Sequence, residues 1–365
     1  MTPLTIAVDA RELAGHVTGV GVYLLNLLRE WLPRDDVTIA LISHRGLSAD
    51  VAALPDIDRA HLIVRPDRTG GTIWEQLTLP GGATEAMADV LFAPAYSAPL
   101  GTSLPTVVVI HDVSFAAHPE WFRPLERVRR NFITPRSARR ARTVITISHF
   151  SAREIEARLG VPADRIRVIP PGAPARHGAP IPIASRDPLV VFVGSIFNRR
   201  HVPDLIAAFA MAAREHPDAR LLIAGADRTW PPQNIPARIA ASGAASHITW
   251  LESPSNARIA DALSRASAGA FLSEYEGFAL TPFEALAHAV PSVMLDTPVA
   301  REVYGDAAVY VQAGDVAGTA AALSRLLGDP DERAAIVDRA APLWERYDWA
   351  RAAGETLQVL REAAR

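Results

Sequence analysis

The segment Leu189-Val190-Val191-Phe192-Val193-Gly194-Ser195 shows the pattern that decides the fold. Its five consecutive apolar residues predict a strand that is buried on both faces, and the glycine after them ends it. Apolar residues then recur at Leu205, Ala208, Phe209 and Ala212, which is the spacing of a helix with one face packed on a sheet. A buried strand followed by such a helix is typical of a βαβ unit with parallel strands.

Similar apolar runs occur along the whole chain, with helical stretches between them. We predict strands at 4–8, 37–42, 88–92, 106–110 and 143–147, and then at 189–193, 220–223, 247–251, 268–272 and 292–295. The two series are separated by 170–188, which contains six prolines and few large apolar residues. The sequence therefore predicts an α/β protein with two doubly wound, Rossmann-like domains, at 1–172 and 188–345, joined by a linker at 173–187.

Composition excludes several classes of function. The 365 residues are 49% hydrophobic and 21% charged, with a net charge of -3, so no global basic field indicates a nucleic-acid partner. Cysteine and lysine are both absent, which excludes disulfides, thiolate chemistry, Schiff bases and a lysine-dependent P-loop. No apolar run is long enough to span a membrane and no signal peptide is evident, so we expect a cytoplasmic protein.

Open parallel sheets bind ligands outside the carboxyl ends of their strands. Gly19 and Gly21, in the run Thr18-Gly19-Val20-Gly21, open a helix after the first strand, where free N–H groups attract phosphate. The alternatives are a plain tight turn and the dinucleotide-binding fingerprint of a dehydrogenase, which would need a third glycine where Leu24 stands. His111 directly follows 106–110, and is either a ligand contact or a structural, hydrogen-bonded histidine.

Two further candidates follow strands of the second series. Arg199 and Arg200 come after Val193, and they either clamp a diphosphate or belong to a solvated turn. In Ser273–Ala285, Thr281, Pro282 and Glu284 predict a capping box with Thr281 as N-cap, which explains Glu284 without a ligand. Glu276, in the loop before that helix, has no such structural explanation.

The frame Glu-Gly-Phe-x-Leu-x-x-x-Glu-Ala at 276–285 resembles the donor site of retaining glycosyltransferases of family 4, the group 1 glycosyltransferases with the GT-B fold. The resemblance covers nearly the whole chain. It also rests on short motifs in the same order: Asp9-Ala10-Arg11, Thr18-Gly-Val-Gly, Trp74-Glu75-Gln76, His111-Asp112, Ser148-x-x-Ser151 and Ala300-Arg301-Glu302-Val303.

This resemblance implies two domains that face a central cleft, the first binding the acceptor and the second the nucleotide sugar, with a C-terminal helix at 346–365 that crosses back to the first domain. It implies catalytic roles for Glu276, His111 and Arg200. Donor binding would involve Gly19, Gly21, Gly194, Ser195, Arg199, Arg200, Gly277, Phe278, Ala279, Leu280 and Glu284. The family often has arginine at the position of Ser195, lysine at that of Arg200 and glycine at that of Ala279.

The implied reaction is metal-independent hexose transfer with retention, with no cofactor besides the nucleotide sugar. The motifs Thr-Gly-Val-Gly at 18–21 and His-Asp-Val-Ser-Phe at 111–115 are similar to those of bacterial polysaccharide mannosyltransferases. Mannose from GDP-mannose is therefore our first expectation for the donor, and a saccharide or lipid-linked saccharide for the acceptor. A pyridoxal phosphate phosphorylase would need a lysine, which the chain lacks. The alternative is a nucleotide-sugar-binding or epimerase-type GT-B protein without transferase activity.

The stretch 121–142 contains eight arginines and one acid, Glu126, with apolar residues between them. It is either a solvated helix face or a peripheral contact with the anionic inner face of a membrane. The second alternative rests on the fact that basic amphipathic helices bind such surfaces. The Asp-x-Asp sequences at 56–58 and 329–331 do not follow predicted strands, and Asp329-Pro330 is typical of a helix start, so we expect no metal site.

Overall fold

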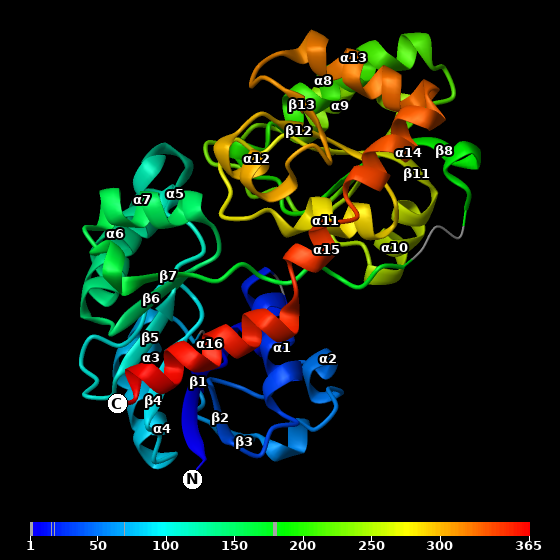
Figure 1. Ribbon diagram of the computed structural model, residues 1–365. Helices are drawn as coiled ribbons and strands as arrows, with labels where there is room; N and C mark the ends of the chain where they lie inside the picture. The colour runs from blue at the N-terminus through cyan, green and yellow to red at the C-terminus, as the bar shows by residue number, and fades with distance from the viewer. Residues whose placement is uncertain (1–2, 16, 18, 69, 178–180) are drawn as a thin grey trace. The chain divides into compact units, whose positions relative to one another are not determined.

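The computed structural model in Figure 1 describes residues 3–15, 17, 19–68, 70–177 and 181–365. The chain divides into two compact units. Unit 1 contains Met1–Ala117, Leu125–Gly172 and Tyr347–Arg365, and unit 2 contains His118–Pro124 and Ala173–Arg346. The predicted linker at 173–187 thus lies in unit 2, whereas nearly all of the segment predicted as the C-terminal helix lies in unit 1.

Unit 1 is built on a parallel sheet of seven strands in the order β3-β2-β1-β4-β5-β6-β7. The strands are β1 (Leu4–Asp9), β2 (Val37–Ser43), β3 (His61–Val64), β4 (Val90–Ala93), β5 (Thr106–Val109), β6 (Thr143–Thr146) and β7 (Ile166–Val168). The helices are α1 (Gly19–Trp31), α2 (Ala49–Ala52), α3 (Thr72–Leu77), α4 (Leu79–Glu85), α5 (Ser114–Ala117), α6 (Pro124–Arg140), α7 (His149–Leu159) and α16 (Trp349–Ala363).

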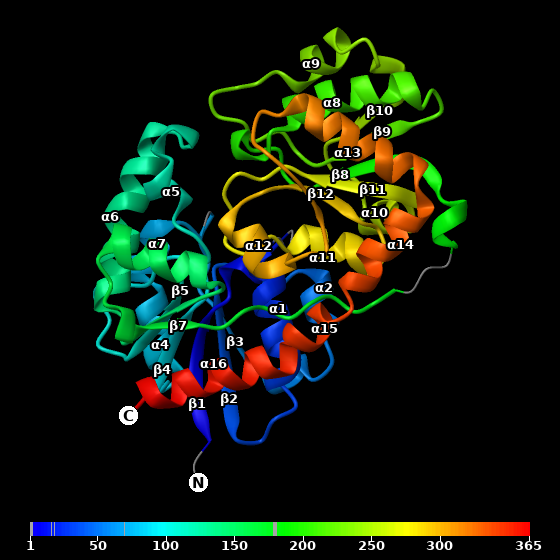
Figure 2. The ribbon, with the colours of Figure 1, turned by 45° about the horizontal axis from the view of Figure 1, so that its top comes forward.

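The C-terminal helix α16 packs along α1, as both ribbon views show (Figures 1 and 2). Its inward face is apolar, with Leu357 and Leu360 buried. The indole N–H of Trp31 in α1 donates a hydrogen bond of 3.1 Å to the carbonyl of Ala353. The last helix of the sequence therefore completes the core of unit 1 instead of extending unit 2.

Unit 2 contains a parallel sheet of six strands in the order β10-β9-β8-β11-β12-β13. The strands are β8 (Asp187–Val193), β9 (Arg220–Ala224), β10 (Ile248–Leu251), β11 (Ala266–Phe271), β12 (Ser292–Leu295) and β13 (Val309–Val311). The helices are α8 (Val202–Glu215), α9 (Ile235–Ala241), α10 (Asn256–Arg265), α11 (Leu280–Ala287), α12 (Pro298–Tyr304), α13 (Val316–Gly328), α14 (Pro330–Arg339) and α15 (Leu343–Arg346).

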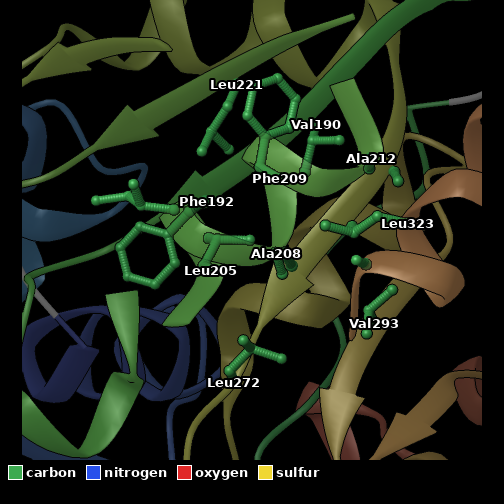
Figure 3. Packing of buried hydrophobic residues seen from close by; sticks show 14 of the residues in the cluster. Val190, Phe192, Leu205, Ala208, Phe209, Ala212, Leu221, Leu272, Val293 and Leu323 are labelled. Carbon is green, nitrogen blue, oxygen red and sulfur yellow. The ribbon is translucent and has the colours of Figure 1, made fainter. Parts of the chain in front are cut away.

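The core of unit 2 confirms the helix pattern predicted after β8. Leu205, Ala208, Phe209 and Ala212 are all buried and lie against strand residues such as Val190, as Figure 3 shows. Helices α8 and α13 cover this face of the sheet, and residues of α10 and α11 belong to a second cluster with Val191 and Val193. Helices on both faces make the sheet doubly wound, as predicted.

Candidate active site

The predicted donor residues of unit 2 meet at one edge of its sheet. Gly194–His201 follow β8 and Ser273–Ala279 follow β11, and these two strands are neighbours at the centre of the sheet. The strand order reverses between them, because β9 and β10 follow β8 on one side of the sheet and β12 and β13 follow β11 on the other. Ligands of open parallel sheets bind at such a reversal of strand order, outside the carboxyl ends.

Gly194 gives Arg200 room to fold back over the end of β8. The backbone at Gly194 has a φ of +124°, which favours glycine, and a Cβ atom there would overlap Nη1 of Arg200. Arg200 Nη1 donates a hydrogen bond of 3.1 Å to the carbonyl of Ser195. The sequence Gly194-Ser195 thus fixes the position of the arginine head group.

Arg200 forms an ion pair with Glu276 from the loop after β11. Nε of Arg200 lies 3.3 Å from Oε1 of Glu276, and both side chains are mostly buried. Burial lowers the pKa of the Arg200 guanidinium, while the charge of Glu276 acts in the opposite direction. Two residues that were predicted separately as candidates therefore form a single charged pair.

Further contacts tie the same two loops together. The N–H of Glu274 donates to the carbonyl of Arg199 at 2.8 Å. The imidazole of His201 lies between two carboxylates, with Nδ1 at 3.0 Å from Asp204 and Nε2 at 3.1 Å from Glu274. Neither His201 nor Glu274 was predicted as a site residue, although His201 directly follows Arg200 and Glu274 lies in the candidate segment Ser273–Ala285.

The predicted capping box at Thr281 is wrong. Helix α11 begins at Leu280, its N-cap is Ala279 in the left-handed region at a φ of +66°, and no side chain of a described residue caps it. Thr281 therefore lies inside the first turn, and Glu284 is the fifth residue of the helix. The first N–H groups of α11 are hydrogen-bond donors that an anion can engage.

Glu284 consequently has no capping role. Burial raises the pKa of its carboxyl group to about 7. A partly buried acid that the helix start does not require, in the helix that follows the loop of Glu276, is typical of a residue kept for ligand contact.

Aromatic side chains hold the loop that precedes α11. The rings of Phe278 and Phe283 are stacked with centroids 5.8 Å apart, and the hydroxyl of Tyr304 in α12 donates to the carbonyl of Ala279. These contacts keep Ala279 in a conformation that usually selects glycine. Sequence reasoning did not find Tyr304, because its contact partner lies 25 residues away.

In unit 1, Gly19 and Gly21 form the first turn of α1, whereas Thr18 lies outside the described residues. A Cβ atom on Gly21 would lie 2.6 Å from the carbonyl oxygen of Glu12, so this glycine allows α1 to approach the preceding loop closely. A Cβ on Gly19 would meet nothing within 4 Å. Gly21 thus has a packing role, and Gly19 leaves the helix start accessible.

His111 lies in a closely packed environment at the end of β5. It is buried, its Nε2 is 2.8 Å from the carbonyl of Pro94, and its ring meets Tyr23 edge-on at 5.1 Å. Burial lowers the pKa of His111, so the ring is neutral at pH 7. Nε2 then donates to Pro94, which leaves Nδ1 as an acceptor.

Three other predicted motifs of unit 1 have structural roles, and one of them contacts His111. Ser148 caps α7 by accepting from the N–H of Ser151, and Ser151 Oγ donates to the carbonyl of His111 at 3.0 Å. Arg11 bridges Asp9 and Glu75 with distances of 2.6 Å to each carboxylate. This network joins the end of β1 to α3 and fixes the carboxyl edge of the sheet.

Within the described part of the chain, no group of three or more histidine, aspartate or glutamate side chains is placed to hold a metal ion. Asp329 accepts hydrogen bonds from the N–H groups of Asp331 and Glu332, which confirms the prediction that it opens a helix. The described helices include none that is both long and apolar enough to cross a bilayer.

The fold and site define a protein with two Rossmann-like units and two arginines, Arg199 and Arg200, at the β8/β11 edge of unit 2. The family model described as Glycosyl transferases group 1 matches residues 176–342, and the model described as Glycosyltransferase Family 4 matches residues 17–176. The chain therefore belongs to the group 1 glycosyltransferases.

Several characterised proteins are similar in sequence. The chain is 26% identical to MMP alpha-(1->4)-mannosyltransferase of Mycolicibacterium hassiacum, over 71% of this chain and 66% of that protein. It is 24% identical to O-antigen chain mannosyltransferase B of Escherichia coli, over 70% of each. Glycogen synthase of Mycobacterium tuberculosis is 29% identical over 72% of this chain and 64% of its own length. The match to the first of these thus spans just under two thirds of that relative.

Solved structures confirm the GT-B architecture. HepE from Anabaena, solved with UDP and glucose, has a TM-score of 0.77 at 17% identity, covering 98% of this chain and 100% of HepE. WaaG, described as a glycosyltransferase of lipopolysaccharide biosynthesis, has a TM-score of 0.73 at 14% identity, covering 98% and 99%.

Proposed function

We propose that this protein is a retaining hexosyltransferase that uses a nucleoside diphosphate sugar as donor. The observation that carries the proposal is the Arg200–Glu276 pair at the reversal of strand order, beside the uncapped start of α11. It combines a cation for a diphosphate with a carboxylate for sugar hydroxyls in one small site.

The cationic part of the site suits a diphosphate without a metal ion. Arg199 and Arg200 supply guanidinium groups, which form charge-assisted and often bidentate hydrogen bonds to phosphate. The N–H groups at the start of α11, with those of Gly277 and Phe278, add donors and the positive end of the helix dipole. We infer that these groups replace the divalent cation that other glycosyltransferases use.

The proposed reaction breaks the bond between the anomeric carbon and the diphosphate oxygen. The acceptor hydroxyl forms the new bond on the same face of the sugar, and its proton passes to the departing phosphate oxygen, so the anomeric configuration is kept. Negative charge grows on the diphosphate as the bond breaks, and Arg200 with the α11 N–H groups stabilises it. We assign Glu276, which pairs with Arg200, to the hydroxyls of the transferred sugar.

Unit 1 contributes two groups of its own to the proposal. Gly19 leaves the N–H groups at the start of α1 accessible to a phosphate, and Nδ1 of the neutral His111 is an acceptor for a sugar hydroxyl. Two relatives are named as mannosyltransferases, which supports mannose from GDP-mannose as the first choice, with a saccharide or lipid-linked saccharide of polysaccharide biosynthesis as acceptor. HepE, in contrast, is described with UDP and glucose.

The donor is tested by thermal shift with a panel of GDP-, UDP- and dTDP-sugars, since a ligand that binds the native state raises its stability by mass action. The donor that gives the largest shift is then incubated with saccharide acceptors, and nucleoside diphosphate is measured. Acceptor-dependent release with an α-configured product from an α-configured donor supports the proposal. Binding without turnover favours the nucleotide-sugar-binding alternative, and sugar epimerisation without an acceptor favours the epimerase alternative.

A further inference from the structure

Helices α3 and α6 of unit 1 expose an unusual number of large apolar side chains. Five residues of these two short segments are more than half exposed: Ile73 (77%), Leu77 (77%), Leu125 (87%), Val128 (64%) and Phe132 (53%). We call this set the α3/α6 surface. Side chains of this size are rarely gathered in solvent without a binding role.

The five side chains lie on two helices that are linked to each other. Leu125, Val128 and Phe132 are spaced i, i+3, i+7 and lie on one face of α6, and Ile73 and Leu77 are spaced i, i+4 on α3. Arg129 also lies on that face of α6, and its Nη1 donates a hydrogen bond of 2.8 Å to Oγ1 of Thr72, which precedes Ile73. The side of α6 that carries the apolar residues is thus tied to the start of α3.

A second contact confirms that the helices are adjacent. Gln76 of α3 donates to the carbonyl of Ala98 at 3.1 Å, and Ser137 of α6 donates to the same carbonyl at 2.9 Å. Both helices therefore rest on the segment around Ala98, and Figure 1 shows them on unit 1 beside its sheet. The surface is held by buried contacts and does not depend on one mobile helix.

The segment that contributes α6 is rich in arginine, and Arg129 and Arg136 lie beside its apolar residues. Residues 125–142 contain seven arginines, at 127, 129, 130, 136, 139, 140 and 142, against the single acid Glu126. Glu126 forms an ion pair with Arg130 at 2.8 Å. The guanidinium of Arg136 lies over the ring of Phe132 at 3.6 Å from its centroid, which places a cation directly beside an exposed apolar group.

This surface differs from the segment singled out in the sequence. Trp121 and Phe122 are only partly exposed and belong to unit 2, and α6 begins after them. The tertiary structure thus removes these two aromatic residues from the basic face and adds Ile73 and Leu77 from α3.

We propose that the α3/α6 surface binds the anionic surface of a lipid bilayer. The apolar side chains would contact the acyl chains of the bilayer, and the arginines beside them would contact its acidic head groups. A nucleic acid would engage the arginines and leave the five apolar side chains in water. The proposal does not depend on the proposed reaction, since it involves neither donor nor acceptor.

Vesicle flotation of the full chain tests this at low and high salt. We expect at least tenfold more protein bound to vesicles of phosphatidylcholine with phosphatidylglycerol than to phosphatidylcholine alone, with most of the difference lost in high salt. Equal binding to both kinds of vesicle, or binding to neither, would overturn the proposal.

Matched variants separate the apolar and the charged contributions. Leu125→Ser/Val128→Ser/Phe132→Ser should lose at least tenfold in binding, whereas Met87→Ser, which removes an 84% exposed side chain elsewhere in unit 1, should bind like wild type. Arg129→Gln/Arg136→Gln should lose several-fold, and Arg153→Gln/Arg351→Gln, which removes the same charge from α7 and α16, should not. The melting temperature of each variant should equal that of wild type, because the altered side chains are exposed. Vesicle binding is compared between variants that meet this condition.

The apolar variant decides between a membrane and a general polyanion. If it floats like wild type while the arginine variant does not, the surface only attracts negative charge and the proposal is wrong. If both arginine variants lose binding equally, net charge and not this surface is responsible, and the proposal is also wrong.

Discussion

Arg200 and Glu276 lie 76 residues apart in the sequence, and their side chains meet with Nε 3.3 Å from Oε1. The pair exists because β8 and β11 are adjacent parallel strands whose carboxyl ends place the following loops side by side. Their opposite charges compensate each other in a mostly buried site. The predictions below begin from this pair.

Arg200→Ala should weaken binding of the nucleoside diphosphate by roughly 10- to 150-fold, since hydrogen bonds to charged groups contribute roughly 1.5–3 kcal/mol. Titration calorimetry measures the dissociation constant. Arg265→Ala is the control, because Arg265 pairs with Asp187 at the start of β8, the opposite edge of the sheet. An unchanged dissociation constant for Arg200→Ala would remove this residue from the site.

Glu276→Gln should lower turnover on the order of 100-fold, because an uncharged amide stabilises the reacting sugar less than a carboxylate does. The melting temperature should stay near that of wild type, since the amide oxygen still accepts a hydrogen bond from Arg200. Steady-state kinetics and thermal unfolding are measured on the same preparation. Full turnover in the variant would assign Glu276 a purely structural role.

Glu284→Gln should stabilise the protein at neutral and higher pH. Burial raises the pKa of Glu284 from 4.5 to about 7, so between these values the folded state keeps a proton that the unfolded state has lost. Stability of the wild type therefore falls as pH rises from about 4.5 to 7, and above pH 7 the variant should be more stable by up to about 3 kcal/mol. Denaturant unfolding at pH 5 and pH 8 tests this, with no pH-dependent difference as the contrary result.

The same variant should bind the donor more weakly, by roughly tenfold or more, if the carboxylate holds ribose hydroxyls. Higher stability with weaker binding is the expected combination. A variant that is less stable at both pH values would instead support the capping role that the sequence suggested for Glu284.

Gly194→Ala should both destabilise the protein and impair donor binding, because the new Cβ would displace the Arg200 guanidinium and the backbone φ of +124° disfavours alanine. Gly354→Ala is the matched control. Its Cβ would meet nothing within 4 Å in the middle of α16, so it should stabilise by about 0.5–1 kcal/mol. Opposite signs for the two variants in thermal unfolding are expected, and a neutral Gly194→Ala would contradict the packing described here.

Hexose transfer should continue in excess EDTA with at most a modest change. The proposed diphosphate site relies on Arg199, Arg200 and the N–H groups of α11, whereas hard cations require converging oxygen ligands. Nucleoside diphosphate release is measured with EDTA, and then with added magnesium or manganese. Complete loss that a metal ion restores would mean that carboxylates outside this site hold the diphosphate.

Much of the fold could be read from the sequence because the central strands are buried on both faces. Each of the ten predicted apolar runs overlaps a strand, and the helical face at Leu205–Ala212 is in the core. The three strands that were not predicted, β3, β7 and β13, are three or four residues long and lie at sheet edges. Partly exposed edge strands need no continuous apolar run, so their sequences carry a weak signal.

The start of α11 shows the limit of local sequence. Thr281, Pro282 and Glu284 favour a capping box by their spacing, yet the helix begins at Leu280. Tyr304 bonds the carbonyl of Ala279, and Phe278 stacks on Phe283, so contacts from α12 and within the aromatic cluster select the left-handed turn at Ala279. Tertiary packing overrode a local preference of about 1 kcal/mol.

The sequence by itself determined the fold class, the strand ends that carry polar residues and the identity of the candidate residues, because burial and strand–helix alternation are local patterns. Only the tertiary structure decided that Arg200 pairs with Glu276, that Glu284 has no capping role and that α3 joins α6 in one apolar and cationic surface. These relations depend on which strands are neighbours and which helices share a support, and such long-range contacts leave no periodic signal in the residues that make them.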